Sequence, residues 1–113
     1  MRAISFFMTT QQFIDGSKDV TRRFGWWNLK SGDQLRAVEK AQGLKKGEKM
    51  KVLGVIEVVS ARREPLNAIT ADDCRREGFP HFTPQQFTTM LCEHYDCAPE
   101  TLCNRIEFKR VTE

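Results

Sequence analysis

The sequence lacks any hydrophobic run long enough to cross a bilayer. Its longest apolar stretches, residues 3–8 and 52–59, are short and are interrupted by polar residues, whereas a spanning helix needs about 20 apolar residues in succession. The N-terminus also lacks the basic segment, apolar segment and small-residue cleavage site of a secretory signal. These absences predict a cytoplasmic protein that has no membrane partner.

The chain also lacks the length for a second domain. It has 113 residues, of which 40% are hydrophobic, and its eight Phe and two Trp supply enough apolar surface for one modest core. No internal repeat or low-complexity tract is present. Residues 1–113 are therefore predicted to form a single domain.

The usual zinc-binding spacings are absent as well. Cys92, His94 and Cys97 lie close together and Cys103 follows, but there is no C-x-x-C pair and no H-x-x-x-H pair. Without export signals, these thiols and that of Cys74 should stay reduced. We expect buried thiols that act as small hydrophobic groups, no bound metal and no cofactor.

Charge of one sign is not in large excess. The chain has 18 Lys and Arg against 15 Asp and Glu, which gives a net charge of +3, and this surplus alone does not indicate a nucleic-acid binder. The basic residues nevertheless cluster at 22–23, 40–51 and 62–63, while the stretch 72–100 is acidic. One basic face is expected, either as a solvated surface or as a contact for RNA.

Local patterns predict five strands and three short helices. The expected strands are residues 3–8, 19–24, 34–38, 50–63 and 105–111. The expected helices run from Thr9 or Thr10 to Gly16, from Thr70 to Gly78, and onward from Thr83-Pro84. Gly54 is a candidate bulge that would bend the long central strand. This order predicts an α+β fold, a sheet curled into a β-barrel of about five to six strands with two or three short helices at its edges.

Residues 16–23 carry the most distinctive chemistry. A turn glycine, Gly16, places Lys18 at the entry to a strand, and the strand alternation directs Thr21 and Arg23 to the same face. A Lys whose pKa is lowered can act as a base, and a Thr hydroxyl needs such a base to become a nucleophile. Sequence alone does not establish whether the fold brings Glu77 to this group.

At these residues the sequence resembles the ASCH domain family. The family motif has the form Gly-x-Lys-x-x-(Thr or Glu)-x-Arg, and Gly16, Lys18, Thr21 and Arg23 match it. Further matching segments, in order, are Gly32-Asp33, Glu64-Pro65-Leu66, Glu77-Gly78-Phe79 and the strand 105–108. The resemblance covers nearly the whole chain and implies a PUA-like barrel.

The resemblance implies two functions. Small bacterial members of the family are amidohydrolases that cleave the amide of N4-acetylcytidine to cytidine and acetate, and their catalytic Lys, Thr and Glu correspond here to Lys18, Thr21 and Glu77. Many other members have Glu in place of the Thr, so Thr21 favours the hydrolase. The fold has also been expected to bind RNA, which makes a non-catalytic RNA-binding module the alternative. The segment Trp26-Trp27 and the basic loop 40–51 also resemble phage or prophage versions of the domain.

The hydrolase hypothesis assigns a role to each residue. Lys18 takes the proton of Thr21, Thr21 attacks the acyl carbonyl, and water then releases the acid. Glu77 orients Lys18 or protonates the departing amine, and Arg23 stabilises the oxyanion. The partner would be a small modified nucleoside bound by a monomer or weak homodimer, with substrate contacts from Arg23, Trp26 and Trp27.

Structural roles for the same residues remain open. Lys18, Arg23 and Glu77 can equally form a buried ion network that holds the mouth of the barrel. Trp26 and Trp27 can equally belong to the core. His81 and His94 have no partner arrangement typical of a catalytic triad, so both are expected in loops or on the surface.

Overall fold

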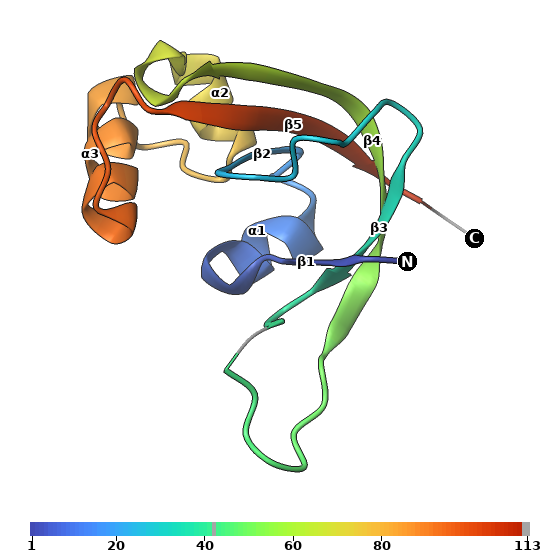
Figure 1. The fold of residues 1–113 in the computed structure, drawn as a ribbon. Helices are drawn as coiled ribbons and strands as arrows, with labels where there is room; N and C mark the ends of the chain where they lie inside the picture. The colour runs from blue at the N-terminus through green and yellow to red at the C-terminus, as the bar shows by residue number, and fades with distance from the viewer. Residues whose placement is uncertain (42, 112–113) are drawn as a thin grey trace.

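The computed structural model describes residues 1–41 and 43–111 of the chain. Gln42, within the predicted basic loop, and residues 112–113 lie outside the described residues. The strands are β1 (Ala3–Ser5), β2 (Val20–Arg23), β3 (Gln34–Val38), β4 (Val52–Pro65) and β5 (Leu102–Arg110). The helices are α1 (Thr10–Asp15), α2 (Ala71–Arg76) and α3 (Pro84–Tyr95), with 3-10 turns η1 (Phe7–Thr9) and η2 (Leu66–Ala68) (Figure 1). Of the helices described, none has the length and apolar character that a bilayer span requires.

The strands form one mixed sheet in the order β1-β3-β4-β5-β2. β1 pairs with β3 in parallel, and the other neighbours are antiparallel. The long strand β4 curves across the molecule (Figure 1), because its first half pairs with β3 and its second half with β5. Its pairing skips Leu53, beside the predicted bulge at Gly54, and skips Val59. Such extra residues bend a strand and increase its twist.

The sheet is not closed into a barrel, which corrects the sequence-based prediction. In the described part of the chain, no strand pairing joins the two edge strands, β1 and β2. The strand predicted over residues 3–8 ends at Ser5 because the chain then turns into η1, so β1 is too short to reach β2. A side chain spans the gap instead, since Nη2 of Arg23 donates to the carbonyl oxygen of Ser5 at 2.6 Å.

The helix ends follow the predicted signals. Thr83 begins α3 with a complete capping box that includes Gln86, and Pro84 is the first helical residue. Thr70 begins α2, where its side chain accepts a hydrogen bond from the backbone N–H of Asp73. The Thr70 cap fixes where α2 starts and therefore where Glu77, the residue that follows α2, is placed.

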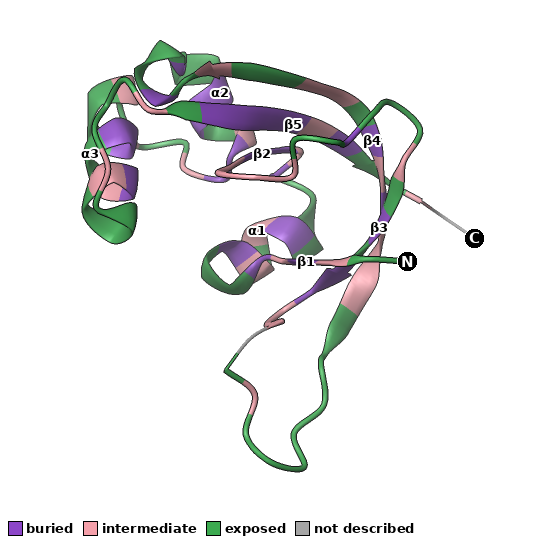
Figure 2. Cartoon of the chain, in the orientation of Figure 1, coloured by how far each residue is buried: buried purple, intermediate pink, exposed green. Residues whose placement is uncertain are grey.

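The core consists of two clusters of buried side chains. The first surrounds the stacked rings of Phe6 and Phe13, whose centroids are 4.9 Å apart, and includes Ile106 and Phe108 of β5. The second lies under α3 and contains Leu66, Ile69, Cys74, Phe87, Leu91 and Cys103. Figure 2 shows that the buried segments of β3, β5, α1 and α2 line the interior. The prediction that thiols fill the core is confirmed for Cys74 and Cys103, which are fully buried.

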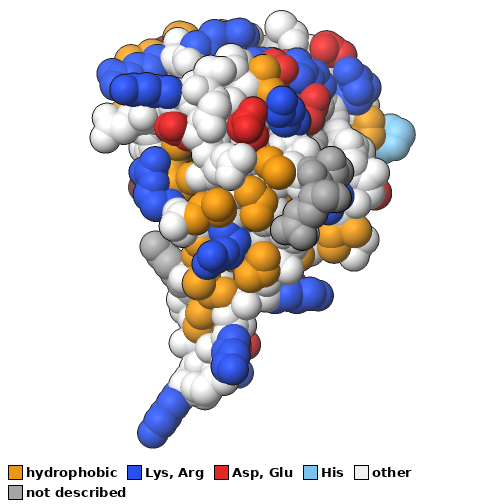
Figure 3. Space-filling model, turned by 90° about the vertical axis from the view of Figure 1, so that its right-hand side faces the viewer, with side chains coloured by type: hydrophobic (Ala, Val, Ile, Leu, Met, Phe, Trp, Pro, Cys, Tyr) orange, Lys and Arg blue, Asp and Glu red, His pale blue; other side chains and the backbone are white. Residues whose placement is uncertain are grey.

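The connection between β3 and β4 projects away from the sheet (Figure 1) and carries the basic residues of the predicted loop. On the face shown in Figure 3, hydrophobic side chains gather in the middle, and Lys and Arg side chains are distributed around them and along the projection. Positive charge on this face is therefore scattered and does not form one continuous block.

Two glycines that end helices provide a test of the packing between α1 and α2. Gly16 and Gly78 both have positive φ, 83° and 97°, so Ala at either site should cost about 1–2 kcal/mol. A Cβ at Gly16 would meet nothing within 4 Å, whereas a Cβ at Gly78 would lie 2.7 Å from Cγ of Gln12. We expect Gly78→Ala to lower the free energy of unfolding in urea clearly more than Gly16→Ala does; equal losses would contradict this packing.

Candidate functional site

A pocket of about 290 Å³ opens between η1 and α3, with β2 at its base. Its volume is near the lower end of the roughly 300–1,000 Å³ typical of small-molecule sites. Its charged and hydroxyl-bearing side chains include Lys18, Thr21, Arg22, Arg23 and Glu77. Three of these, Lys18, Thr21 and Glu77, are the residues predicted to be catalytic, so the fold brings them to one pocket.

Backbone contacts hold the entry to β2 against both flanking helices. After the left-handed turn at Gly16, the N–H of Lys18 donates to the carbonyl of Gln12 at 3.1 Å, and the N–H of Asp19 donates to the carbonyl of Arg76 at 2.9 Å. Since Arg76 ends α2 and Glu77 follows it, this second contact brings Glu77 close to Lys18.

Lys18 and Glu77 form a buried ion pair. Nζ of Lys18 donates to Oε1 of Glu77 at 2.7 Å and to its backbone oxygen at 2.9 Å, and both side chains are almost fully buried. Burial lowers the pKa of Lys18, and the attraction of Glu77 opposes this effect without cancelling it. A larger fraction of Lys18 is therefore neutral, and able to accept a proton, than for a Lys in water.

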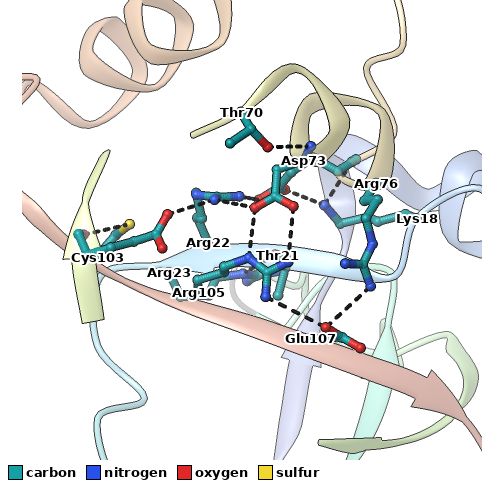
Figure 4. Close-up of polar contacts among 12 residues, drawn as sticks. Lys18, Thr21, Arg22, Arg23, Thr70, Asp73, Arg76, Cys103, Arg105 and Glu107 are labelled. Carbon is teal, nitrogen blue, oxygen red and sulfur yellow. Dashed lines mark hydrogen bonds and ion pairs between the residues drawn. The ribbon is translucent and has the colours of Figure 1, made fainter. Parts of the chain in front are cut away.

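Arg22 extends this ion pair into a larger network of charged side chains. Its guanidinium donates to Glu77 at 3.1 Å, to Glu64 at 2.9 Å and to Asp73 at 2.6 Å. Asp73 also accepts two bonds from Arg105, at 2.7 and 3.0 Å (Figure 4). The predicted ion network therefore exists, but it is built on Arg22 and not on Arg23.

Thr21 and Arg23 project together, as the alternation of β2 predicts. Nε of Arg23 donates to Oγ1 of Thr21 at 3.0 Å, and Thr21 is only 3% exposed. Among the described residues, the Thr21 hydroxyl accepts this hydrogen bond but donates none. No hydrogen bond joins Thr21 to Lys18 there. The Thr21 proton therefore remains available to a group that enters the pocket.

Arg23, which is half-buried, differs in its partners from the buried cations Lys18 and Arg22. Its two hydrogen bonds go to neutral oxygens, of Thr21 and Ser5, and its guanidinium lies 5.2 Å from the ring centre of Phe6. Burial lowers the pKa of Arg23, opposed by weaker attractions from Tyr95 and Glu77. The side chain is held rigidly beside Thr21 while part of its donor capacity stays free.

The two tryptophans lie outside the pocket. Trp26 packs against the first core cluster and lines an adjoining hollow, with Arg2 over its ring at 4.9 Å. Trp27 is 41% exposed, and Arg63 lies over its ring at 4.8 Å. The structure therefore does not bring these two predicted substrate contacts to Lys18 and Thr21.

Aromatic residues at the pocket mouth were not predicted as site residues. Phe7 of η1 and Tyr95 of α3 both line the pocket and remain largely exposed. His94 lines it too, although it is exposed, as the sequence predicts. The helical spacing of α3 indicated that His94 or Tyr95 would share a face with Phe87, but spacing alone could not show what that face meets.

The described residues include no group of three or more His, Cys, Asp or Glu side chains arranged to hold a metal ion. The side chains that line the pocket supply an amine, hydroxyls, a carboxylate, two guanidinium groups, an imidazole and a phenol.

Asp73 provides a test of how much the network contributes to stability. Hydrogen bonds from Arg105 and Arg22 hold the pKa of Asp73 well below its usual value. Below about pH 4 the unfolded chain therefore binds a proton that the folded chain does not, so this contribution to stability falls as the pH falls. We expect Asp73→Asn to cost about 3–5 kcal/mol at pH 7, because it removes the negative charge that the buried guanidinium groups of Arg22 and Arg105 share.

Denaturation in urea at pH 3, 4, 5 and 7 measures this effect. Asp73→Asn should also show a weaker loss of stability between pH 5 and pH 3 than the unmodified protein. Asp72→Asn is the matched control, since among the described residues Asp72 pairs only with the exposed Arg75, and it should change stability by less than about 1 kcal/mol. Equal effects of the two substitutions would show that the network contributes little.

No family model and no curated protein sequence matches the chain. The fold resembles a solved structure, that of protein EF3133 from Enterococcus faecalis V583, which is assigned to the family model DUF984. The two share a TM-score of 0.67 at 16% sequence identity, over 98% of this chain and 76% of that one. At this identity the likeness shows a shared fold: a small α+β domain with an open five-stranded mixed sheet.

Proposed function

We propose that the protein is an amidohydrolase that cleaves the N4-acyl amide of N4-acetylcytidine or a related N4-acylcytosine nucleoside, and that residues 1–113 form an ASCH domain of the PUA-like type. The observation that carries this proposal is the meeting of Lys18, Thr21 and Glu77 in one pocket. These three residues come from two segments more than 50 positions apart in the chain, and they supply a base, a nucleophile and an orienting carboxylate.

The proposed reaction is acyl transfer through Thr21. Lys18, in its neutral form, takes the Thr21 proton, Oγ1 forms a bond to the acyl carbon, and the C–N bond breaks as Lys18 passes that proton to the departing N4 amine. Water then attacks the Thr21 ester, the ester C–O bond breaks, Thr21 regains a proton, and the acid leaves. Lys18 and Thr21 are not hydrogen-bonded without substrate, and bonds of this kind often tighten only in the substrate complex.

Glu77 and Arg23 support these steps in different ways. Glu77 fixes Lys18 through the contact of 2.7 Å, and Arg22 holds the opposite oxygen of the same carboxylate. The bond from Arg23 to Oγ1 of Thr21 stabilises negative charge that develops on that oxygen when the proton leaves. Both interactions exist before substrate binds, so little reorganisation is needed.

The pocket mouth suits a flat ring. The exposed aromatic rings of Phe7 and Tyr95, on η1 and α3, take the place that the sequence hypothesis gave to Trp26 and Trp27. A pyrimidine can stack on such side chains whatever its substituents. The acyl group would then point inward, to Thr21.

Substitutions at the three catalytic residues test the proposal. Thr21→Ala, Lys18→Ala and Glu77→Ala should each reduce kcat/KM for N4-acetylcytidine by more than about 100-fold, and Thr21→Ser should retain part of the rate because a hydroxyl survives. The double change of Lys18 and Thr21 should cost scarcely more than either single change, because residues that act as a unit are not additive. The absorbance change from N4-acetylcytidine to cytidine measures the rates.

Thr88→Val is the matched control for the loss of a hydroxyl. Thr88 is also buried, but its hydroxyl bonds to the carbonyl of Pro84 within α3 and it does not line the pocket. The Thr88→Val variant should hydrolyse N4-acetylcytidine at the unmodified rate. Circular dichroism checks that each variant folds. Absence of turnover by the intact protein would refute the proposed function, whereas full activity of Thr21→Ala would refute only the role of Thr21.

The second candidate function is a non-catalytic RNA-binding module. It is favoured by a hollow of about 250 Å³ in which Lys40, Lys49 and Lys51 outnumber Glu39 and Glu48, and which shares Phe7 with the main pocket. Binding of a single-stranded RNA should then weaken steeply between 50 and 200 mM salt and weaken further when these three lysines are changed to Gln. Fluorescence anisotropy measures both effects, and undetectable binding at low salt would exclude this function.

A further inference from the structure

Among the described residues, Arg23 is the cation of this pocket that has no carboxylate partner. Lys18 pairs with Glu77, and Arg22 pairs with three carboxylates. In contrast, no carboxylate of the described residues lies within 4 Å of the Arg23 guanidinium, whose hydrogen bonds go to Thr21 and Ser5. Arg23 is half-buried, so its charge has lost part of its water without gaining an opposite charge, which is unfavourable.

The pocket as a whole carries the same imbalance. Three cations, Lys18, Arg22 and Arg23, line it against the single carboxylate of Glu77. The other carboxylates that balance Arg22, those of Asp73 and Glu64, are not among the lining residues. An anion that enters the pocket therefore meets a surplus of positive charge in partly desolvated surroundings, where attraction is stronger than in water.

Arg23 is placed to bind such an anion with defined geometry. Of its five guanidinium hydrogens, one is used on Thr21 and one on Ser5, and the remaining three have no partner in the part of the chain that the structure describes. Because the two existing bonds fix the plane of the guanidinium, the free hydrogens, on Nη1 and Nη2, form a rigid donor set on a residue that lines the pocket. A planar carboxylate matches such a set best.

We propose that Arg23 is the centre of a binding site for a small monocarboxylate, and that this site holds the acid that the reaction releases. The identity of that acid rests on the proposed function, whereas the site itself rests on the unpaired cation. The carboxylate carbon is the former acyl carbon, which was bonded to Thr21, so the acid is formed where the free hydrogens of Arg23 can receive it. Acetate therefore competes with the substrate for the pocket.

Titration of the intact protein with sodium acetate tests this site. Backbone NMR shifts are followed at constant ionic strength, with sodium chloride replaced stepwise by acetate. We expect saturable shifts centred on Thr21, Arg23 and Tyr95, and at least a tenfold weaker apparent affinity in Arg23→Gln. Arg63→Gln, which removes a guanidinium that lies over Trp27, is the matched control and should bind acetate normally.

Several results would overturn the proposal. These are shifts that do not saturate, shifts centred away from Thr21 and Arg23, or equal affinity in Arg23→Gln and the unmodified protein. If Arg23→Gln does not fold, Arg23→Lys replaces it; this variant keeps the charge but loses the fork, and it should bind acetate more weakly than the unmodified protein. The residues whose NMR signals shift in the unmodified protein show where acetate binds, whether or not either variant folds.

The test separates this site from the proposed reaction. Acetate binding that depends on Arg23, with no hydrolysis of N4-acetylcytidine, would keep the anion site and refute the amidohydrolase. Hydrolysis that acetate does not inhibit competitively, with no acetate binding, would keep the amidohydrolase and refute the anion site.

Discussion

The carboxylate of Glu77, held between Lys18 and Arg22, is the interaction on which the rest of the site depends. One oxygen accepts from the amine at 2.7 Å and the other from the guanidinium at 3.1 Å. The contact joins β2 to the end of α2, two segments that are distant in sequence. If it were removed, two buried cations would face each other without the anion between them, and the base of the pocket would lose its geometry.

The open edge of the sheet lies beside this interaction. β1 ends at Ser5, no pairing joins its edge to that of β2 in the described part of the chain, and Arg23 bridges the two edges through Ser5. A closed barrel would pair the backbone at this gap and leave less room for side chains. The pocket exists where strand pairing stops, and the residue that spans the opening is the one that contacts Thr21.

The sequence predicted local structure well and long-range arrangement only in part. Capping residues such as Thr70 and Thr83 and the turn at Gly16 act within a few positions, so their effects can be read from the chain. Closure of the barrel was predicted wrongly, because the length of β1 depends on the turn after Ser5 and not on its apolar run. Arg22 was missed because its carboxylate partners, 42 to 55 positions away, are visible only after folding.

The cations at the pocket differ in the kind of partner they have. Asp73 has two guanidinium partners and Arg22 has three carboxylate partners, an arrangement that neutralises charge and fixes positions. Arg23, in contrast, is half-buried and has no carboxylate partner among the described residues, and the Thr21 hydroxyl beside it donates no hydrogen bond to them. Because buried ion pairs add little net stability, the network matters chiefly through the positions that it fixes for Lys18, Arg22 and Glu77 at the pocket.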